Sequence, residues 1–134
     1  MKDELLFHHV GVACRDIRKT KDFYVNMGYT PADVVDDPLQ HVKVCFLEKE
    51  NAPRIELLAP LDDQSPVLRT LEASGVTPYH ICYQVEDIDA AIARLRQERF
   101  LLINGPVPAC AMGGRRIAFL FQKHTGLIEI VEYR

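Results

Sequence analysis

The stretch Phe7-His-His-Val-Gly-Val-Ala-Cys-Arg-Asp-Ile17 returns later in the chain as Pro78-Tyr-His-Ile-Cys-Tyr-Gln-Val-Glu-Asp-Ile88. A histidine and an Asp-Ile pair recur in these two stretches with identical spacing between them. Further along, Ile55-Glu-Leu-Leu58 returns as Ile128-Glu-Ile-Val131, at nearly the same offset along the chain. Repeated motifs in one order, at a nearly constant offset, indicate that the chain contains two copies of one unit.

A third pair of motifs, Cys45-Phe-Leu47 and Ala118-Phe-Leu120, lies between the other two and shares the offset of the second pair. Turn residues and hydrophobic periodicity predict the order strand, helix, strand, strand, strand in each unit. The expected strands are 7–14, 29–35, 41–48, 53–60, 79–85, 99–104, 115–122 and 127–133. Helices are expected to begin at the N-caps Asp16 and Asp87, and a linking helix after Ser65-Pro66 is expected to end at Gly75.

The sequence therefore predicts an α+β fold built from two repeated βαβββ modules. We expect one domain over residues 1–134, with module one at 7–60, a linker helix at 61–76 and module two at 77–134. The segment 105–114 is long, uncharged and rich in small residues, which suits either a lid over a site or a slack connection.

Four side chains of metal-ligand type occupy equivalent places in the two units. Alternation along a strand puts His9 and His80 on the less apolar face of their strands, opposite the residues that should pack on the helices. Glu56 and Glu129 lie within apolar runs, where a carboxylate is costly to bury unless something pairs with it. Two histidines and two glutamates brought together by the repeat would bind one divalent cation. By the same alternation, His8 faces the helices and is expected to be structural, and His41 and His124 are expected at solvated turn edges.

Composition places the chain among ordinary globular proteins. Of its 134 residues 48% are hydrophobic, and its formal net charge is −3. Such a balance argues against nucleic acid or an anionic membrane as a partner, and no apolar run approaches the ~20 residues of a spanning helix. The first residues lack the apolar core of a signal peptide, and Cys14, Cys45, Cys82 and Cys110 form no Cys-x-x-Cys pair. We therefore expect a cytoplasmic protein with reduced thiols.

Several of these motifs resemble the vicinal oxygen chelate superfamily, which includes glyoxalases, bleomycin resistance proteins and dioxygenases. The similar stretches are His9-Val-Gly-Val-Ala, Ile55-Glu-Leu-Leu-Ala-Pro60, His80-Ile, Arg116-Ile-Ala-Phe-Leu120 and Gly126-Leu-Ile-Glu129. The most similar branch is that of the methylmalonyl-CoA epimerases. The resemblance implies an incomplete barrel around one divalent ion (Co, Mn, Ni, Zn or Fe) that His9, Glu56, His80 and Glu129 hold.

The same resemblance implies a reaction. An enolate would be stabilised by bidentate chelation, and Glu129 would transfer a proton next to a carbonyl of a small substrate such as an acyl thioester. Related proteins are commonly homodimers. Some epimerases carry a catalytic glutamate where this chain has Val44, and many have a second histidine where it has Tyr79. We therefore expect slow or absent turnover of methylmalonyl-CoA itself.

Two other functions stay open at this point. A glyoxalase I-like lactoylglutathione lyase would use the same four ligands, so the metal residues do not separate it from an epimerase. A metal-free, drug-resistance type of binding protein is the other, although such members generally lack the ligand set. A ring-cleaving dioxygenase fits less well, because that chemistry typically uses two histidines and one carboxylate.

Overall fold

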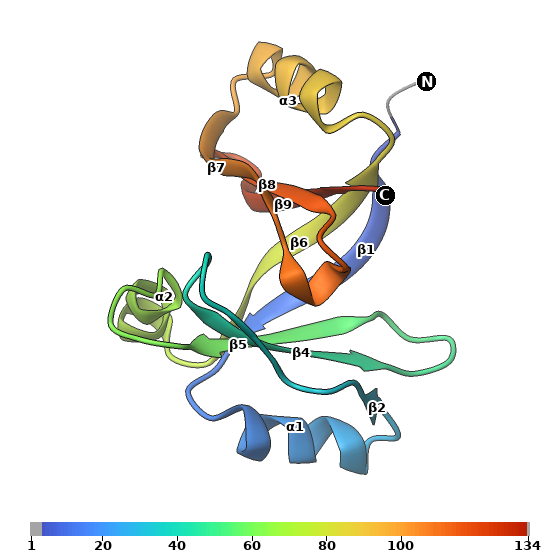
Figure 1. Ribbon diagram of the computed structural model, residues 1–134, viewed down its shortest axis with the longest axis vertical. Helices are drawn as coiled ribbons and strands as arrows, with labels where there is room; N and C mark the ends of the chain where they lie inside the picture. The colour runs from blue at the N-terminus through green and yellow to red at the C-terminus, as the bar shows by residue number, and fades with distance from the viewer. Residues whose placement is uncertain (1–3, 134) are drawn as a thin grey trace. The chain divides into compact units, whose positions relative to one another are not determined.

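The computed structural model describes residues 4–133 (Figure 1). Over this range the chain is α+β, with nine strands, three α-helices and one 3-10 helix. Parallel and antiparallel strand pairs both occur, so the sheet is mixed. The chain divides into two compact units. We call residues 9–79 the N-terminal unit, and the rest of the described chain, with residues 80–133 as its main part, the C-terminal unit.

The N-terminal unit combines a small sheet with two helices. Its elements are β1 (Leu6–Ala13, which begins in the other unit), α1 (Ile17–Asn26), β2 (Thr30–Pro31), β3 (Val35–Asp37), β4 (Val42–Glu48), β5 (Ile55–Pro60) and α2 (Val67–Ser74). The strand order is β2-β4-β5-β1, with β3 also paired to β4. Strand β1 runs parallel to β5, whereas β4 runs antiparallel to β5.

The C-terminal unit has the corresponding arrangement. Its elements are β6 (Thr77–Val85, which begins in the other unit), α3 (Ile88–Gln97), β7 (Leu101–Pro108), the 3-10 helix η1 (Cys110–Met112), β8 (Arg116–Gln122) and β9 (Gly126–Glu132). The strand order is β6-β9-β8-β7. Strand β6 runs parallel to β9, and β8 runs antiparallel to both β9 and β7.

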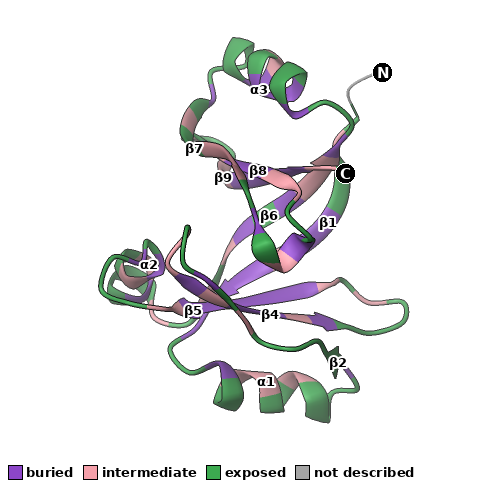
Figure 2. Cartoon of the chain, viewed as in Figure 1, coloured by how far each residue is buried: buried purple, intermediate pink, exposed green. Residues whose placement is uncertain are grey.

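Each unit has its own hydrophobic core between the helix and one face of the sheet. Val12, Cys14, Cys45 and Leu57 belong to the core of the N-terminal unit, together with Ile17 of α1. The core of the C-terminal unit contains Val85, Leu120 and Ile130 with Ile88, Ile92 and Leu95 of α3. Figure 2 shows the buried residues concentrated on the strands and the exposed ones on the outer sides of the helices. The expected alternation is confirmed, because Val12 and Cys14 face the helix and His9 does not.

Both predicted helix starts are confirmed. The Asp16 carboxylate accepts a hydrogen bond from the backbone N–H of Lys19 at 3.3 Å, and that of Asp87 accepts from Ala90 at 3.1 Å. These caps satisfy N–H groups that have no partner within the helix. The linking helix ends at Gly75 as expected, although it begins at Val67, and the Ser65 hydroxyl accepts from the Val67 N–H.

Two expectations were wrong in detail. The strand expected at 29–35 is two short pieces, β2 and β3, because the chain leaves the pairing with β4 after Pro31 and rejoins it at Val35. The segment 105–114 is not a slack loop, since β7 continues to Pro108 and η1 follows. Prolines are tolerated in β7 because it is an edge strand of the sheet. Backbone N–H groups on its outer side have no neighbouring strand to pair with, so a residue without an N–H costs no hydrogen bond there. No helix within residues 4–133 is long and apolar enough to cross a membrane.

Candidate functional site

In the N-terminal unit, strands β1 and β5 bring His9 and Glu56 together. Glu56 is the register partner of Gly11, which lies two residues after His9 on the same face of β1. The His9 Nε2 atom lies 3.0 Å from Oε1 of Glu56, and the two side chains are 0% and 4% exposed. A carboxylate this deeply buried is stable only beside a group that compensates its charge.

In the C-terminal unit, strands β6 and β9 place His80 and Glu129 in the same way. Glu129 is the register partner of Cys82, which lies two residues after His80. The His80 Nε2 atom lies 3.1 Å from Oε1 of Glu129, with exposed fractions of 0% and 3%. The sequence repeat therefore corresponds to a repeated side-chain geometry, with one buried His–Glu pair in each unit.

An aromatic ring completes each pair. Phe46 of β4 is the register partner of Glu56, and its ring meets the His9 ring edge to face, with centroids 5.2 Å apart. Phe119 of β8 is the partner of Glu129 and meets the His80 ring at 5.3 Å. These phenylalanines were not predicted as site residues. They could have been found because a phenylalanine occupies the same place in both copies of the third repeated motif.

The donor atoms of each pair suit a divalent transition metal. Imidazole nitrogen and carboxylate oxygen are ligands that such ions accept. In the two pairs these atoms lie 3.0 and 3.1 Å apart, within hydrogen-bonding distance of each other. By donor type the pairs suit the ion expected from the sequence, and each of them would supply one nitrogen and one oxygen.

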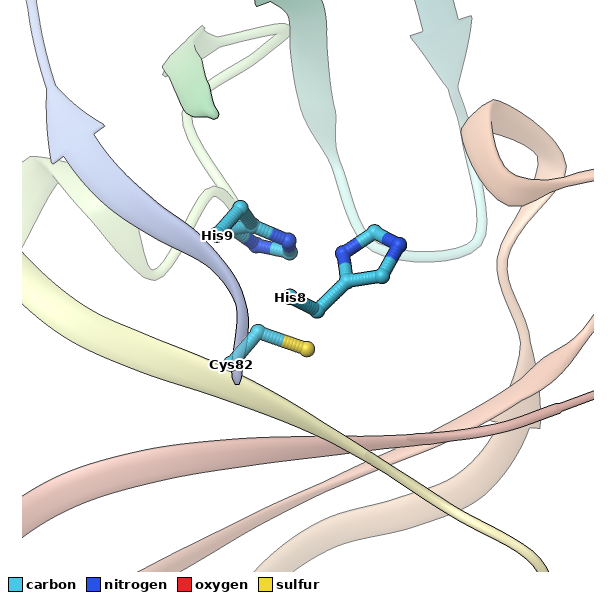
Figure 3. A group of neighbouring side chains, drawn as sticks. All are labelled: His8, His9 and Cys82. Carbon is cyan, nitrogen blue, oxygen red and sulfur yellow. The ribbon is translucent and has the colours of Figure 1, made fainter. Parts of the chain in front are cut away.

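His8 belongs to a different environment. Figure 3 shows it with Cys82 and His9. His8 and Cys82 are both part of the C-terminal unit, and their ligand atoms lie within 4.8 Å of one another. The Arg115 guanidinium Nη2 lies 3.5 Å from Nε2 of His8. The structural role expected for His8 stays a prediction.

The other residues that the sequence singled out lie outside the two His–Glu pairs. His124 is exposed, as expected. His41 is not simply solvated, because its Nδ1 lies 3.0 Å from Oδ2 of Asp62. That hydrogen bond lowers the pKa of the Asp62 carboxyl. Val44 is 3% exposed and shares a face of β4 with Phe46, so an aliphatic side chain occupies this part of the face.

Comparison with known proteins gives consistent similarities over most of the chain. A family model described as the Glyoxalase/Bleomycin resistance protein/Dioxygenase superfamily matches residues 8–119. The ethylmalonyl-CoA/methylmalonyl-CoA epimerase of Cereibacter sphaeroides is 35% identical over 120 residues, which cover 87% of each chain.

Two solved structures are similar in fold. One is the methylmalonyl-CoA epimerase of Mycobacterium tuberculosis, with a TM-score of 0.83 and 27% identity over 94% of this chain and 86% of that one. The other is a variant of the Streptomyces coelicolor methylmalonyl-CoA epimerase in complex with 2-nitronate-propionyl-CoA. Its TM-score is 0.82, with 28% identity over 96% of this chain and 98% of that one.

Proposed function

Because this chain belongs to the Glyoxalase/Bleomycin resistance protein/Dioxygenase superfamily, we propose that it is an epimerase or isomerase of an acyl thioester. The observation that carries the proposal is the buried His–Glu pair, present once in each unit with the same register and the same spacing. The 35% identity to an ethylmalonyl-CoA/methylmalonyl-CoA epimerase supports this reaction class. The acyl-CoA analogue bound to the Streptomyces coelicolor relative supports a thioester as substrate.

We propose further that the two units are repeated βαβββ modules that form an incomplete barrel. In that arrangement His9, Glu56, His80 and Glu129 would hold one divalent ion, such as Co, Mn, Ni, Zn or Fe. The equal parallel pairings β1–β5 and β6–β9 support the repeat. When bound, the ion would supply a Lewis acid that lowers the energy of the negative charge developing on an enolate.

Glu129 is the proposed base of the reaction. Its side chain is 3% exposed and lies beside His80, and its register partner on β8 is Phe119, so bulk water does not surround it. A carboxylate beside a chelated substrate can accept the proton that leaves the carbon next to the carbonyl. In a productive complex its oxygen would need to come within ~2.6–3.2 Å of the proton that it removes.

Val44 limits the reaction that we expect. Two-base epimerisation needs a second proton carrier on the opposite face of the substrate, and a valine carries no proton. Water, Glu48 or Lys43 could take that role, although alternation puts Lys43 on the other face of β4 from Val44. We therefore expect slow turnover of methylmalonyl-CoA and faster reaction of a related acid, thioester or ketone. A one-base lyase acting on a glutathione hemithioacetal is the second candidate, and Val44 is the observation that favours it.

Proton exchange in D2O tests the proposal. The metal-loaded protein is incubated separately with (2R)- and (2S)-methylmalonyl-CoA, other acyl-CoA thioesters and a glutathione hemithioacetal, and deuterium uptake at the α-carbon is followed by NMR. We expect exchange with at least one thioester, and Glu129→Gln should reduce its rate about a hundredfold or more. Reaction of the hemithioacetal alone would establish the lyase. Absence of exchange with every compound would contradict both enzymes and favour a binding protein.

A further inference from the structure

The beginnings of helices α1 and α3 lie beside equivalent strand pairs, but they carry opposite charge. In the C-terminal unit, Arg116 of β8 lies against Glu132 of β9. Its Nε donates to Oε1 of Glu132 at 3.1 Å and its Nη2 donates to Oε2 at 3.1 Å. Nη2 also lies 3.4 Å from Asp89, the second residue of α3. Carboxylates of the unit itself therefore neutralise this arginine.

The N-terminal unit lacks those carboxylates. Lys43 of β4 occupies the place of Arg116, and its register partner on β5 is Ala59 where the other unit has Glu132. The second residue of α1 is Arg18 in place of Asp89. Before the N-cap, Arg15 stands in place of Glu86. Three positions that are acidic in the C-terminal unit are thus basic or neutral here.

These substitutions create a cationic pocket of about 450 Å³ at the start of α1. Arg15, Arg18, Lys21 and Lys43 surround it, and Ile17 and Ala59 contribute apolar surface. The Arg15 Nη2 is fixed by donating to the Leu71 carbonyl at 3.1 Å. Lys43 pairs with Asp36 at 3.2 Å, and both side chains are about half exposed.

The acidic residue of the pocket is already engaged, since the Asp16 carboxylate accepts from the Lys19 N–H as the cap of α1. Four cations and one carboxylate line the pocket, and Asp36 pairs with Lys43 from outside the lining. Cations therefore outnumber carboxylates by four to two, in a chain whose formal net charge is −3. The equivalent pocket of the C-terminal unit is lined by Glu86, Asp87 and Glu132 with the single cation Arg116.

The cationic pocket is separate from the proposed catalytic residues. Lys43 and Ala59 alternate with Val44 and Leu58, so they face the helix side of the sheet, as Cys45 and Leu57 do. His9 and Glu56 lie on the other face. A ligand in the pocket would therefore not reach the His9–Glu56 pair through the sheet, and the inference does not depend on the proposed reaction.

We propose that this pocket binds a phosphate group, which takes the place that the Glu132 carboxylate has in the other unit. A phosphate is favoured over a carboxylate for two reasons. A guanidinium group can donate two parallel hydrogen bonds to two phosphate oxygens, and a doubly charged anion can neutralise several cations at once. The N-terminus of α1 adds a favourable dipole. The pocket volume lies within the ~300–1,000 Å³ range of small-molecule sites, so a nucleotide-sized organic phosphate fits as well as the free ion.

Calorimetric titration of the full chain with ADP and with inorganic phosphate tests the site. We expect saturable binding of one ligand per chain that weakens as salt is raised. Arg18→Glu should weaken it at least about tenfold, because it restores the acidic residue of the other unit. Lys19→Glu is the matched control, since it makes the same charge change on the same helix outside the pocket. ADP binding more tightly than phosphate would identify an organic phosphate as the ligand, and equal affinities would identify the free ion.

A second variant keeps the test independent of any folding defect in the first. Lys21→Glu reverses a second charge that lines the pocket, at a position outside the hydrophobic core, and should reduce binding by a similar factor. His80→Ala should leave binding unchanged, which separates this site from the proposed metal residues. The inference would be overturned by absence of saturation with both ligands, or by equal effects of Arg18→Glu and Lys19→Glu.

Discussion

The ring of Phe46 meets the imidazole of His9 edge to face, at a centroid distance of 5.2 Å and an interplanar angle of 81°. Phe119 has the same relationship to His80, at 5.3 Å and 88°. Each phenylalanine is only half-buried, although the histidine and glutamate that it adjoins are buried. Each ring therefore packs against an imidazole whose Nε2 atom lies beside a buried carboxylate.

Loss of this ring contact should weaken metal binding without unfolding the protein. Aromatic pairs contribute about 0.5–1.5 kcal/mol beyond area burial, so Phe119→Leu should raise the Kd for Mn or Co by up to about tenfold. Isothermal titration calorimetry measures the affinity, and circular dichroism reports the fold. Phe121→Leu, two residues along β8 and 40% exposed, is the matched control. Equal affinities of the two variants would show that the ring does not position His80.

A bound ion should stabilise the protein, because it neutralises the buried carboxylates Glu56 and Glu129. A chelator should lower the Tm, and Mn, Co or Zn should restore it. The gain should follow RT ln(1 + [L]/Kd), or ~2.7 kcal/mol at a free ion concentration of one hundred times Kd. His80→Ala should abolish the shift, whereas His124→Ala should not. A His80→Ala variant that still contains one ion per chain would contradict the ligand assignment.

Much of each unit could be predicted from sequence because its determinants are local. Asp16 and Asp87 are helix caps that act within one turn, and alternation correctly separated His9 from the core residues Val12 and Cys14. The edge position of β7 was not predictable, since it depends on which strand pairs with which. The contact between Phe46 and His9 was not predicted for the same reason. Neither was the opposite charge of the two pockets at the starts of α1 and α3. Lys43 and Ala59 lie on different strands, and only the β4–β5 register makes them partners.

The cysteines should differ sharply in reactivity. Burial raises the pKa of the Cys14 thiol to about 11, despite a hydrogen bond with Thr20 that lowers it. This reduces its thiolate fraction near pH 8 roughly a hundredfold relative to the ordinary pKa of 9.0. Cys110 is exposed. Iodoacetamide should alkylate Cys110 in the folded protein, and Cys110→Ser should remove most labelling, as peptide mass spectrometry can check. Rapid alkylation of Cys14 would contradict its burial beneath α1.

The Arg116–Glu132 ion pair should make the stability of the folded protein depend on pH in the acidic range. Hydrogen bonds from Arg116 hold the pKa of Glu132 below its ordinary value of 4.5. Because the pKa of Glu132 is lower in the folded state, the pair contributes its full share of the free energy of unfolding above the ordinary pKa. That contribution is lost as the pH falls through the pKa of the folded state. Glu132→Gln should therefore lower the Tm by a few degrees at neutral pH, and the difference should shrink as pH falls below 4.5. Glu72→Gln, on the exposed side of α2, should show no such trend.

Val44 offers a direct test of why turnover of methylmalonyl-CoA is expected to be slow. Val44→Glu places a carboxylate on the face of β4 that also carries Phe46, the neighbour of His9. The residue is 3% exposed, so both Val44→Glu and the control Val44→Gln should lower the Tm, because each buries a polar group. If a missing second base limits the reaction, only the glutamate should accelerate interconversion of the two epimers, by about tenfold or more. Circular dichroism of the (2R) and (2S) thioesters, or coupled NMR in D2O, measures that rate. Equal rates for the two variants would mean that another group already serves the opposite face, and Glu48 would then be the next residue to replace.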